Sequence, residues 1–213
     1  KTCDSKQLLD SLVNVVPHYG AAMNKAVNEG ALNGRGDAEK MRATVEGGNI
    51  YKEASMIYMK GKDDAYRKAL ELYRQSADKG CVGAMTMLGN MYLKGEGTAP
   101  DVHEALKWRQ MAASQPIWNV EGKIPNLGVQ DALNQIGLMY RDGVGVPKDL
   151  KKAYEYFLKG SQDETKLPGY TLCMHGVGYS LWHGYGVEAD PPRARECFKK
   201  AAVLGCSASQ YNL

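Results

Sequence analysis

A ten-residue string with three glycines recurs along the chain, and it constrains the fold more than any other feature. It reads LGNMYLKGEG at 88–97, IGLMYRDGVG at 136–145 and VGYSLWHGYG at 177–186, and a weaker copy, ASMIYMKG, stands at 54–61. Aligned on their shared glycine, the copies are 34, 48 and 41 residues apart. A period of this length is typical of a repeat array, in which each unit is one supersecondary motif.

Each string is followed by a second segment with helical spacing. These segments lie at 65–80, 101–115, 149–161 and 191–205. Each has an alanine at one matched position and a large apolar residue three or four places later, which puts both on one face of a helix. Each unit therefore predicts a helix A, a glycine-rich turn and a helix B.

Residues at the helix ends fit this division. A glycine stands where helix A should end, and glycine readily adopts the left-handed conformation of a C-cap. These glycines are Gly95, Gly143 and Gly184. An aspartate stands where helix B should begin, and its carboxylate can accept hydrogen bonds from free N–H groups. These aspartates are Asp101, Asp149 and Asp190.

A further glycine recurs inside helix A, where it costs about 1 kcal/mol relative to alanine. It is found at Gly89, Gly137 and Gly178. Because this unfavourable residue returns at one matched position, we expect helix B to approach helix A too closely there for a side chain.

The combined pattern resembles the Sel-1-like repeat family, a relative of the tetratricopeptide repeat. The family pattern is Ala-x3-Leu-Gly-x2-Tyr-x2-Gly-x-Gly-Val, then Asp-x2-Lys-Ala-x2-Trp-Tyr-x2-Ala-Ala-x2-Gly. The second copy matches at Ala84, Leu88, Gly89, Tyr92, Gly95, Gly97, Asp101, Ala105, Trp108, Ala112 and Ala113. The third and fourth copies match at a similar number of places, but the fourth has Cys173 for the alanine and Leu181 for the tyrosine. The resemblance covers 47–213 and implies an all-α fold, a right-handed α-solenoid of helix-turn-helix repeats.

The spacing divides the chain into an N-terminal helical cap and about four repeats. The cap is expected at 1–46, the repeats at 47–80, 81–115, 129–163 and 170–205, an insert at 116–128 and a terminal partial helix at 206–213. Within the cap we expect two helices broken at Pro17, a turn at 33–37 and a short helical segment at 38–45. An atypical cap is what a solenoid needs to cover its first apolar face. The partial helix either opens a further unit or acts as a cap itself.

Composition excludes several functions. The chain has 213 residues and a net charge of +3, too mild to indicate nucleic-acid binding, and it has no apolar run of the roughly 18 residues that a membrane helix needs. It has no Gly-x-Ser-x-Gly, His-Glu-x-x-His or P-loop motif, so we predict no catalytic residue and no cofactor. His175 and His183 lie about 12 Å apart along one helix, too far to share a metal ion.

The five cysteines leave two readings open. Cys173 falls on helix A and Cys197 on helix B of the last repeat, and because those helices are antiparallel neighbours the two thiols could form a disulfide. Alternatively, both are small buried thiols. A disulfide would favour a periplasmic or secreted bacterial protein; a cytoplasmic location is the alternative.

The resemblance to tetratricopeptide arrays implies which side chains line the concave surface. The groove positions are Lys52, Met56, Met59, Lys60, Thr86, Asn90, Leu93, Lys94, Asn134, Leu138, Arg141, Asp142, His175, Tyr179, Trp182 and His183. The last four place two histidines, a tyrosine and a tryptophan on one stripe, although Trp182 could pack internally instead. From these positions and the insert we predict a partner-binding set. It comprises His175, Tyr179, Trp182, His183, Asn134, Leu138, Arg141, Asp142, Asn90, Lys94 and Trp118. Trp118 of the insert either folds back onto a repeat or contacts a partner.

The predicted function is protein binding, because a repeat scaffold offers a long surface and no reactive centre. By resemblance, the candidate roles are a bacterial envelope adaptor or an immunity protein that neutralises a secreted effector. The alternatives are a weak hydrolase or penicillin-binding enzyme, and a secreted host-interaction factor.

Overall fold

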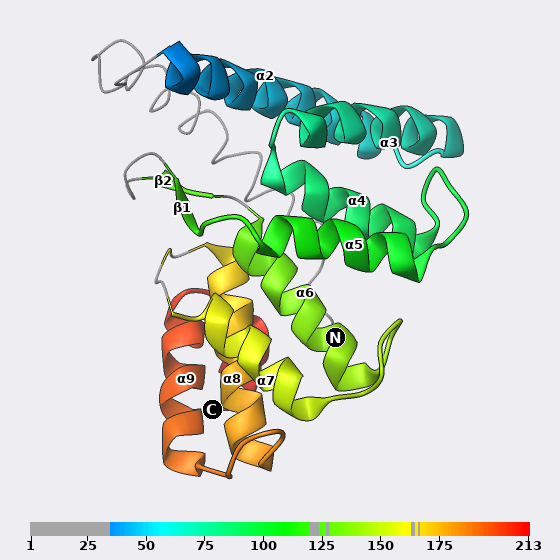
Figure 1. Cartoon of the computed structure of the whole chain (residues 1–213). Coiled ribbons are helices and arrows are strands. Elements are labelled where there is room, and N and C mark those ends of the chain that lie inside the picture. Colours follow the sequence, from blue (N-terminus) through cyan, green and yellow to red (C-terminus); the bar gives the residue numbers. More distant parts are fainter. Residues whose placement is uncertain (1–34, 120–123, 127, 163–164, 166) are drawn as a thin grey trace. The chain divides into compact units, whose positions relative to one another are not determined.

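The computed structural model describes residues 35–119, 124–126, 128–162, 165 and 167–213. Its helices are α2 (Arg35–Tyr58), α3 (Asp63–Asp78), α4 (Val82–Lys94), α5 (Val102–Ala113), α6 (Val129–Asp142), α7 (Leu150–Gly160), α8 (Pro168–His183), α9 (Pro191–Val203) and α10 (Ser207–Tyr211) (Figure 1). Two short strands, β1 (Trp118–Asn119) and β2 (Ile124–Pro125), pair antiparallel within the insert. The prediction of an all-α fold of helix-turn-helix repeats is confirmed.

The chain forms two compact units. The first contains α2, α3 and α4, up to Asp101, and the second contains α5 to α10, from Val102 onward. In the second unit α6 packs on α7 and α8 packs on α9 as consecutive hairpins, and α8 also packs on both α6 and α7. Among the described residues, no helix is both long and apolar enough to cross a membrane.

The helix caps are where the sequence places them. Gly143 and Gly184 have φ values of 75° and 70°, and each donates its N–H to the carbonyl four residues earlier. Asp149 accepts a hydrogen bond from the Lys152 N–H at 2.9 Å, and Asp190 accepts one from the Arg193 N–H at 3.1 Å. Both ends of the A-to-B turn are therefore fixed by local chemistry.

Gly137 and Gly178, inside helix A of their repeats, mark close contacts with helix B, as predicted. A Cβ added to Gly137 would lie 2.5 Å from the Phe157 ring, and one added to Gly178 would lie 2.9 Å from the Phe198 ring. A third glycine completes the arrangement, because a Cβ on Gly176 of α8 would lie 2.6 Å from Phe157. The Phe157 ring of α7 thus fits between a glycine of its own repeat and a glycine of the next.

The second glycine of each turn joins consecutive repeats, a role that the sequence did not reveal. These glycines are Gly97, Gly145 and Gly186, all at positive φ. A Cβ on any of them would overlap the start of the preceding helix B, at Tyr66, Val102 and Leu150 respectively. The turn of one repeat therefore rests on the first turn of the helix B before it.

The largest difference from expectation lies in α2. The predicted turn at 33–37 is wrong from Arg35 onward, because one continuous helix runs from Arg35 to Tyr58 across the expected end of the cap. Gly47 does not break this helix because it packs on α3: its carbonyl accepts a hydrogen bond from Ser76 Oγ at 2.7 Å. The helices expected on either side of Pro17 lie outside the described residues.

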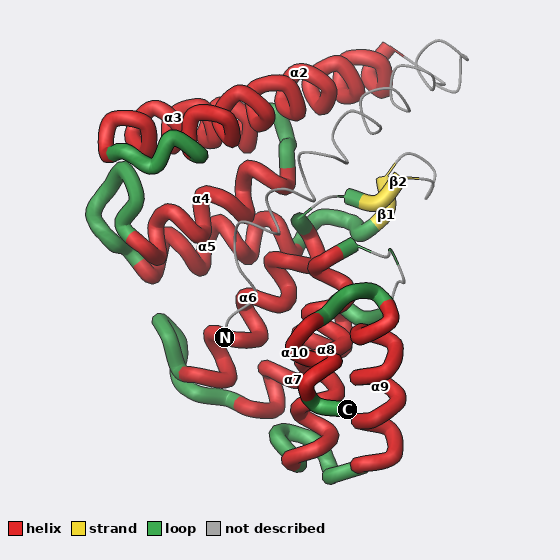
Figure 2. The backbone as a smooth tube through the Cα atoms, turned by 180° about the vertical axis from the view of Figure 1, so that it is seen from behind, coloured by secondary structure: helices red, strands yellow, loops and turns green. Residues whose placement is uncertain are grey.

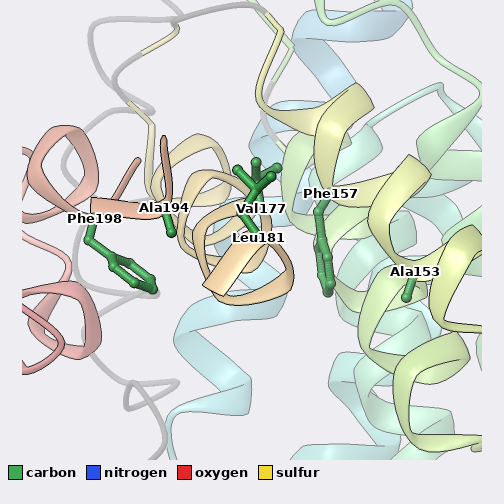
Figure 3. Packing of buried hydrophobic residues seen from close by; sticks show 6 residues of the cluster. All are labelled: Ala153, Phe157, Val177, Leu181, Ala194 and Phe198. Atoms are coloured by element: carbon green, nitrogen blue, oxygen red, sulfur yellow. The ribbon is translucent and has the colours of Figure 1, made fainter. Parts of the chain in front are cut away.

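The core of the second unit is a layer shared by α7, α8 and α9. Val177 and Leu181 of α8 lie between Phe157 of α7 and Phe198 of α9 (Figure 3). A second cluster joins α8 and α9 to the start of α10 through Tyr170, Met174, Ala201 and Cys206. The terminal helix α10 therefore docks beside α9 (Figure 2).

Candidate functional site

Four rings gather along one side of α8 and the turn that follows it. His175, Tyr179 and His183 are spaced i, i+4, i+8, with ring centroids 6.4 Å apart for the first pair and 4.5 Å for the second. Tyr185 extends the row, since its ring stacks on His183 at 5.2 Å and lies 5.9 Å from Tyr179. We call these four residues the ring cluster. Tyr185 was missed from the sequence because it lies between the two turn glycines, outside the helical spacing.

One end of the ring cluster is anchored and the other is open. The His175 ring lies 5.4 Å from Phe198, and its Nδ1 shares a 2.8 Å hydrogen bond with Ser209 Oγ of α10. Burial, and then the positive charge of Arg141, lower the pKa of His175. The imidazole is therefore neutral at pH 7. His183 and Tyr185, at the other end, are exposed to solvent.

Helix α6 adds a charged pair beside the rings. Arg141 donates two hydrogen bonds to Asp142, at 2.7 and 2.8 Å. This interaction lowers the pKa of Asp142, so both groups stay charged near neutral pH. The charge of Arg141 also acts on Tyr179 and His175, which places the pair next to the ring cluster.

The other predicted residues of this unit are placed differently. Leu138 and Tyr179 both pack against the core cluster of α7, α8 and α9. Asn134 is only 4% exposed, so it lies behind the surface and is a poor contact candidate. Trp182 does not join the ring cluster; its ring lies under the Arg195 guanidinium of α9 at 5.8 Å. One residue along a helix is a turn of about 100°, which separates Trp182 from His183.

The predicted groove residues of the first unit have different neighbours. Lys94 lies 3.7 Å from Glu96, which accepts a hydrogen bond from the Tyr58 hydroxyl at 2.7 Å, and Asn90 is half-buried. Met56 and Met59 of α2 are each more than half exposed.

Trp118 of β1, in the second unit, is half-buried in the insert hairpin, and its role in binding stays a prediction.

The second unit also holds a buried charge pair that the sequence did not reveal. Arg109 of α5 is 1% exposed and donates a hydrogen bond to Met139 Sδ at 3.1 Å, while Asp131 of α6 is 7% exposed. Burial raises the pKa of Asp131 to about 6, opposed by the charge of Arg109 and a hydrogen bond from Gln135. Arg109 could have indicated this buried pair from the sequence, because a charged residue stands there where the family pattern has a tyrosine directly after the tryptophan.

Of the two readings of Cys173 and Cys197, the disulfide is wrong. All four cysteines within the described residues are free thiols. Cys173 faces the preceding repeat, where its Sγ donates to the Gln130 carbonyl at 3.2 Å and fills the space left by Gly160. Without the disulfide, a periplasmic or secreted location has lost its main support and stays a prediction only.

Thiol reactivity tests this correction. We expect peptide mapping after alkylation in denaturant without reductant to find Cys81, Cys173, Cys197 and Cys206 all modified. In the native protein Cys173 should react far more slowly than the half-buried Cys197, because burial raises the Cys173 pKa well above its usual range. A disulfide-linked peptide containing Cys173 and Cys197 would contradict the structure.

The site offers recognition chemistry. It presents aromatic faces, hydroxyl and imidazole groups and one charged pair on two packed helices, all suited to binding polypeptide side chains. Among the described residues, no three His, Cys, Asp or Glu side chains are grouped so that they could hold a metal ion.

Comparison with known proteins agrees with the fold. The Sel1 repeat matches four times, at 53–81, 82–116, 130–163 and 171–206. A Sel1 repeat protein from Oxalobacter formigenes superposes with a TM-score of 0.52 at 28% identity, over 66% of this chain and 93% of that one. A protective antigen of uropathogenic Escherichia coli with an SLR fold superposes with a TM-score of 0.58 at 18% identity, over 100% of this chain and 51% of that one. The second likeness concerns the fold alone.

Three curated relatives are regulators by name. The chain is 31% identical over 160 residues to an exopolysaccharide production negative regulator of Rhizobium meliloti, covering 73% of this chain and 56% of that protein. The regulator of the same name in Rhizobium leguminosarum bv. viciae is 26% identical over 161 residues, covering 74% and 57%. Chitin synthase regulatory factor 3 of Schizosaccharomyces pombe is 28% identical over 176 residues, covering 82% and 17%. The chain thus spans little more than half of the bacterial relatives and a small part of the yeast one. Its four matched repeats show that the chain belongs to the Sel1 repeat family, whose members serve as scaffolds for protein–protein interaction.

Proposed function

We propose that the chain binds a protein partner through the ring cluster together with Arg141 and Asp142. The observation that carries this proposal is the open end of the cluster, where the exposed His183 and Tyr185 rings stand beside Tyr179. Tyrosine and arginine are enriched among the residues that dominate binding energy at protein interfaces.

The scaffold also lowers the cost of binding. His175 is held by Ser209 and Phe198, and Tyr179 packs on the core, so these rings are ordered before a partner arrives. Immobilising a free side chain at an interface costs about 0.5–1.5 kcal/mol, and prior ordering avoids much of this loss. The ring cluster is therefore a preorganised surface.

The regulatory names of the relatives support a more specific role. We propose that the chain is an adaptor that regulates its partner by binding it, and that the partner acts in the production of an extracellular or wall polysaccharide. The exopolysaccharide and chitin synthase regulators support this direction, although the chain covers only part of each. Neutralisation of a secreted effector by an immunity protein is the alternative role and stays a prediction.

Affinity capture from an extract of the source cell tests the binding surface. We expect Tyr179→Ala/His183→Ala to lose a partner that the wild type retains, with affinity at least about 30-fold lower, because the two truncations remove central contacts worth about 2 kcal/mol or more. Tyr211→Ala is the control, since it removes a ring that is 92% exposed on α10, outside the cluster. If the double variant captured the same partner as the wild type, the ring cluster would not be the binding surface.

The regulatory role has a separate test. Deletion of the gene should change the amount of extracellular polysaccharide that the cells produce. The wild-type gene should restore the original amount, and the Tyr179→Ala/His183→Ala gene should not. Unchanged polysaccharide after deletion would refute this role and leave the binding surface to be judged by the capture experiment.

A further inference from the structure

The open end of the ring cluster consists of three rings that lie against one another, those of Tyr179, His183 and Tyr185. Their centroids are 4.5 Å apart for Tyr179 and His183, 5.2 Å for His183 and Tyr185, and 5.9 Å for Tyr179 and Tyr185. We call these three residues the ring patch. Rings at these distances are in contact, so the ring patch is one continuous aromatic surface.

The positions of the ring patch are also exposed in the preceding repeat. Asp142 and Val144 stand 41 residues before His183 and Tyr185, at matched positions. A further repeat follows Asp142 and Val144, and both are still exposed: the Asp142 side chain by 48% and Val144 by 39%, compared with 37% for Tyr185. These positions therefore stay open to solvent when a further repeat is present.

The polar groups of the ring patch have no hydrogen-bond partner within the part of the chain that the structure describes. The Tyr179 hydroxyl, the His183 imidazole and the Tyr185 hydroxyl are not engaged there, although their rings touch. In contrast, His175 shares a hydrogen bond with Ser209. Each of the three open groups carries an O–H or N–H donor. A partner that covers the ring patch has to supply acceptors, because a donor buried without one costs free energy.

This combination of aromatic faces and open donors favours one backbone conformation in the partner. The backbone of an α-helix uses its carbonyls for internal hydrogen bonds, so it would leave the donors of the ring patch unpaired. An added β-strand needs the free edge of a sheet, whereas the ring patch lies on α8 and the turn after it. A polyproline II segment has no internal hydrogen bonds, and its proline rings are apolar and lack an N–H. It therefore offers carbonyl acceptors to the donors and apolar rings to the aromatic faces.

The charged pair beside the ring patch agrees with an uncharged segment. Arg141 donates two hydrogen bonds to the Asp142 carboxylate, so the two charges are held together. The pair has no net charge and gives this surface no electrostatic preference for an acidic or phosphorylated segment.

We propose that the partner presents a proline-rich segment in the polyproline II conformation to the ring patch. This inference rests on the proposed function, because it names the part of the partner that the ring cluster binds. The proline rings would pack on the aromatic faces, and carbonyls of the segment would accept hydrogen bonds from Tyr179, His183 and Tyr185. Both surfaces are ordered before they meet, so binding costs little conformational entropy.

Two proline peptides of opposite hand test the inference. One is a fluorescein-labelled peptide of about ten L-prolines, which forms the left-handed polyproline II helix, and its twin of D-prolines forms the mirror image with the same composition. Fluorescence anisotropy should show saturable binding of the L-peptide to the wild-type chain, and binding of the D-peptide at least about tenfold weaker. Tyr179→Ala/His183→Ala should abolish binding of the L-peptide.

Removal of the hydroxyl groups alone separates hydrogen bonding from ring packing. Tyr179→Phe/Tyr185→Phe keeps all three rings and removes two donors. It should weaken binding of the L-peptide at least about fivefold, because two favourable hydrogen bonds are lost. Tyr211→Phe is the matched control, since it removes an exposed hydroxyl of α10 outside the ring cluster, and should leave the affinity unchanged.

The outcomes distinguish this inference from the proposed function. Absence of saturable L-peptide binding, equal binding of both hands, or unchanged affinity in Tyr179→Phe/Tyr185→Phe would each overturn the inference. If affinity capture still shows a cellular partner that Tyr179→Ala/His183→Ala loses, the proposed function stands and only the proline-rich segment is wrong. Retention of the cellular partner by that variant overturns the proposed function, and this inference with it.

Discussion

Replacement of Gly137 by leucine should destabilise the second unit by about 3 kcal/mol, the upper end of the usual cost of overpacking. The added Cβ alone would lie 2.5–3.0 Å from three atoms of the Phe157 ring. The ring cannot move away, because its other neighbour is Gly176, where a Cβ would lie 2.6 Å from it, and Phe157 is only 1% exposed. With a total stability of about 5–15 kcal/mol typical for a domain, urea denaturation followed by circular dichroism would detect this loss readily.

Alanine at two helical glycines provides the matched comparison. Gly137→Ala should destabilise the protein, whereas Gly48→Ala should stabilise it by up to about 1 kcal/mol, because a Cβ on Gly48 meets no atom within 4 Å and alanine favours the helix. An unchanged unfolding midpoint for Gly137→Leu would show that the contact between α6 and α7 does not require glycine.

Replacement of Arg109 by methionine should destabilise the protein by up to about 1.4 kcal/mol for each pH unit above 6, because the Asp131 carboxyl, left without the opposite charge, then has to bind a proton or stay buried as an uncompensated charge. The loss should depend on pH. In the native protein the Asp131 pKa is about 6, above the value of about 3.9 for an unfolded chain, so its ionisation lowers stability as pH rises from about 4 to about 6. Without Arg109 the native pKa rises further, and the loss of stability extends to higher pH.

Denaturant unfolding at pH 5 and pH 8 measures this effect. We expect the difference in the free energy of unfolding between wild type and Arg109→Met to be larger at pH 8 than at pH 5. The double variant Arg109→Met/Asp131→Asn should recover most of the stability, because no charge then remains buried. A difference in the free energy of unfolding that is the same at both pH values would indicate a packing effect and contradict a role for the Asp131 charge.

The parts of the fold that sequence predicts are those governed by local and periodic rules. Gly143 and Asp149 follow from the conformations that helix ends require, and Gly137 follows from an unfavourable residue that recurs at one position. The same residues recur at matched positions in the repeats, which strengthens the prediction. The helices and turns of the repeats were therefore predictable without the structure.

Features that depend on which neighbour a residue meets were not predictable in the same way. The cap was expected to end at 46, but α2 continues through Gly47, whose carbonyl accepts a hydrogen bond from Ser76 of α3. Trp182 and Arg195 come together from two helices, and Arg109 and Asp131 likewise. None of these pairs produces a periodic pattern in the sequence.

The sequence already contained evidence against a disulfide between Cys173 and Cys197. Cys173 precedes Gly178 by five residues, which is a rotation of about 140° around the helix. Since Gly178 faces α9, Cys173 had to face elsewhere, and it lies against Gln130 and Gly160. Helical phase within helix A, combined with the glycine argument, was enough to exclude a bond to Cys197.

Photo-crosslinking in the source cell tests the central claim most directly. A benzoyl-phenylalanine at position 185 would place the reactive group at the exposed end of the ring cluster, and the same group at position 211 would serve as control. We predict one abundant protein adduct from position 185 and none from position 211, with the adduct lost when Tyr179 and His183 are both alanine. No adduct from position 185, or the same adduct from both positions, would contradict binding at the ring cluster.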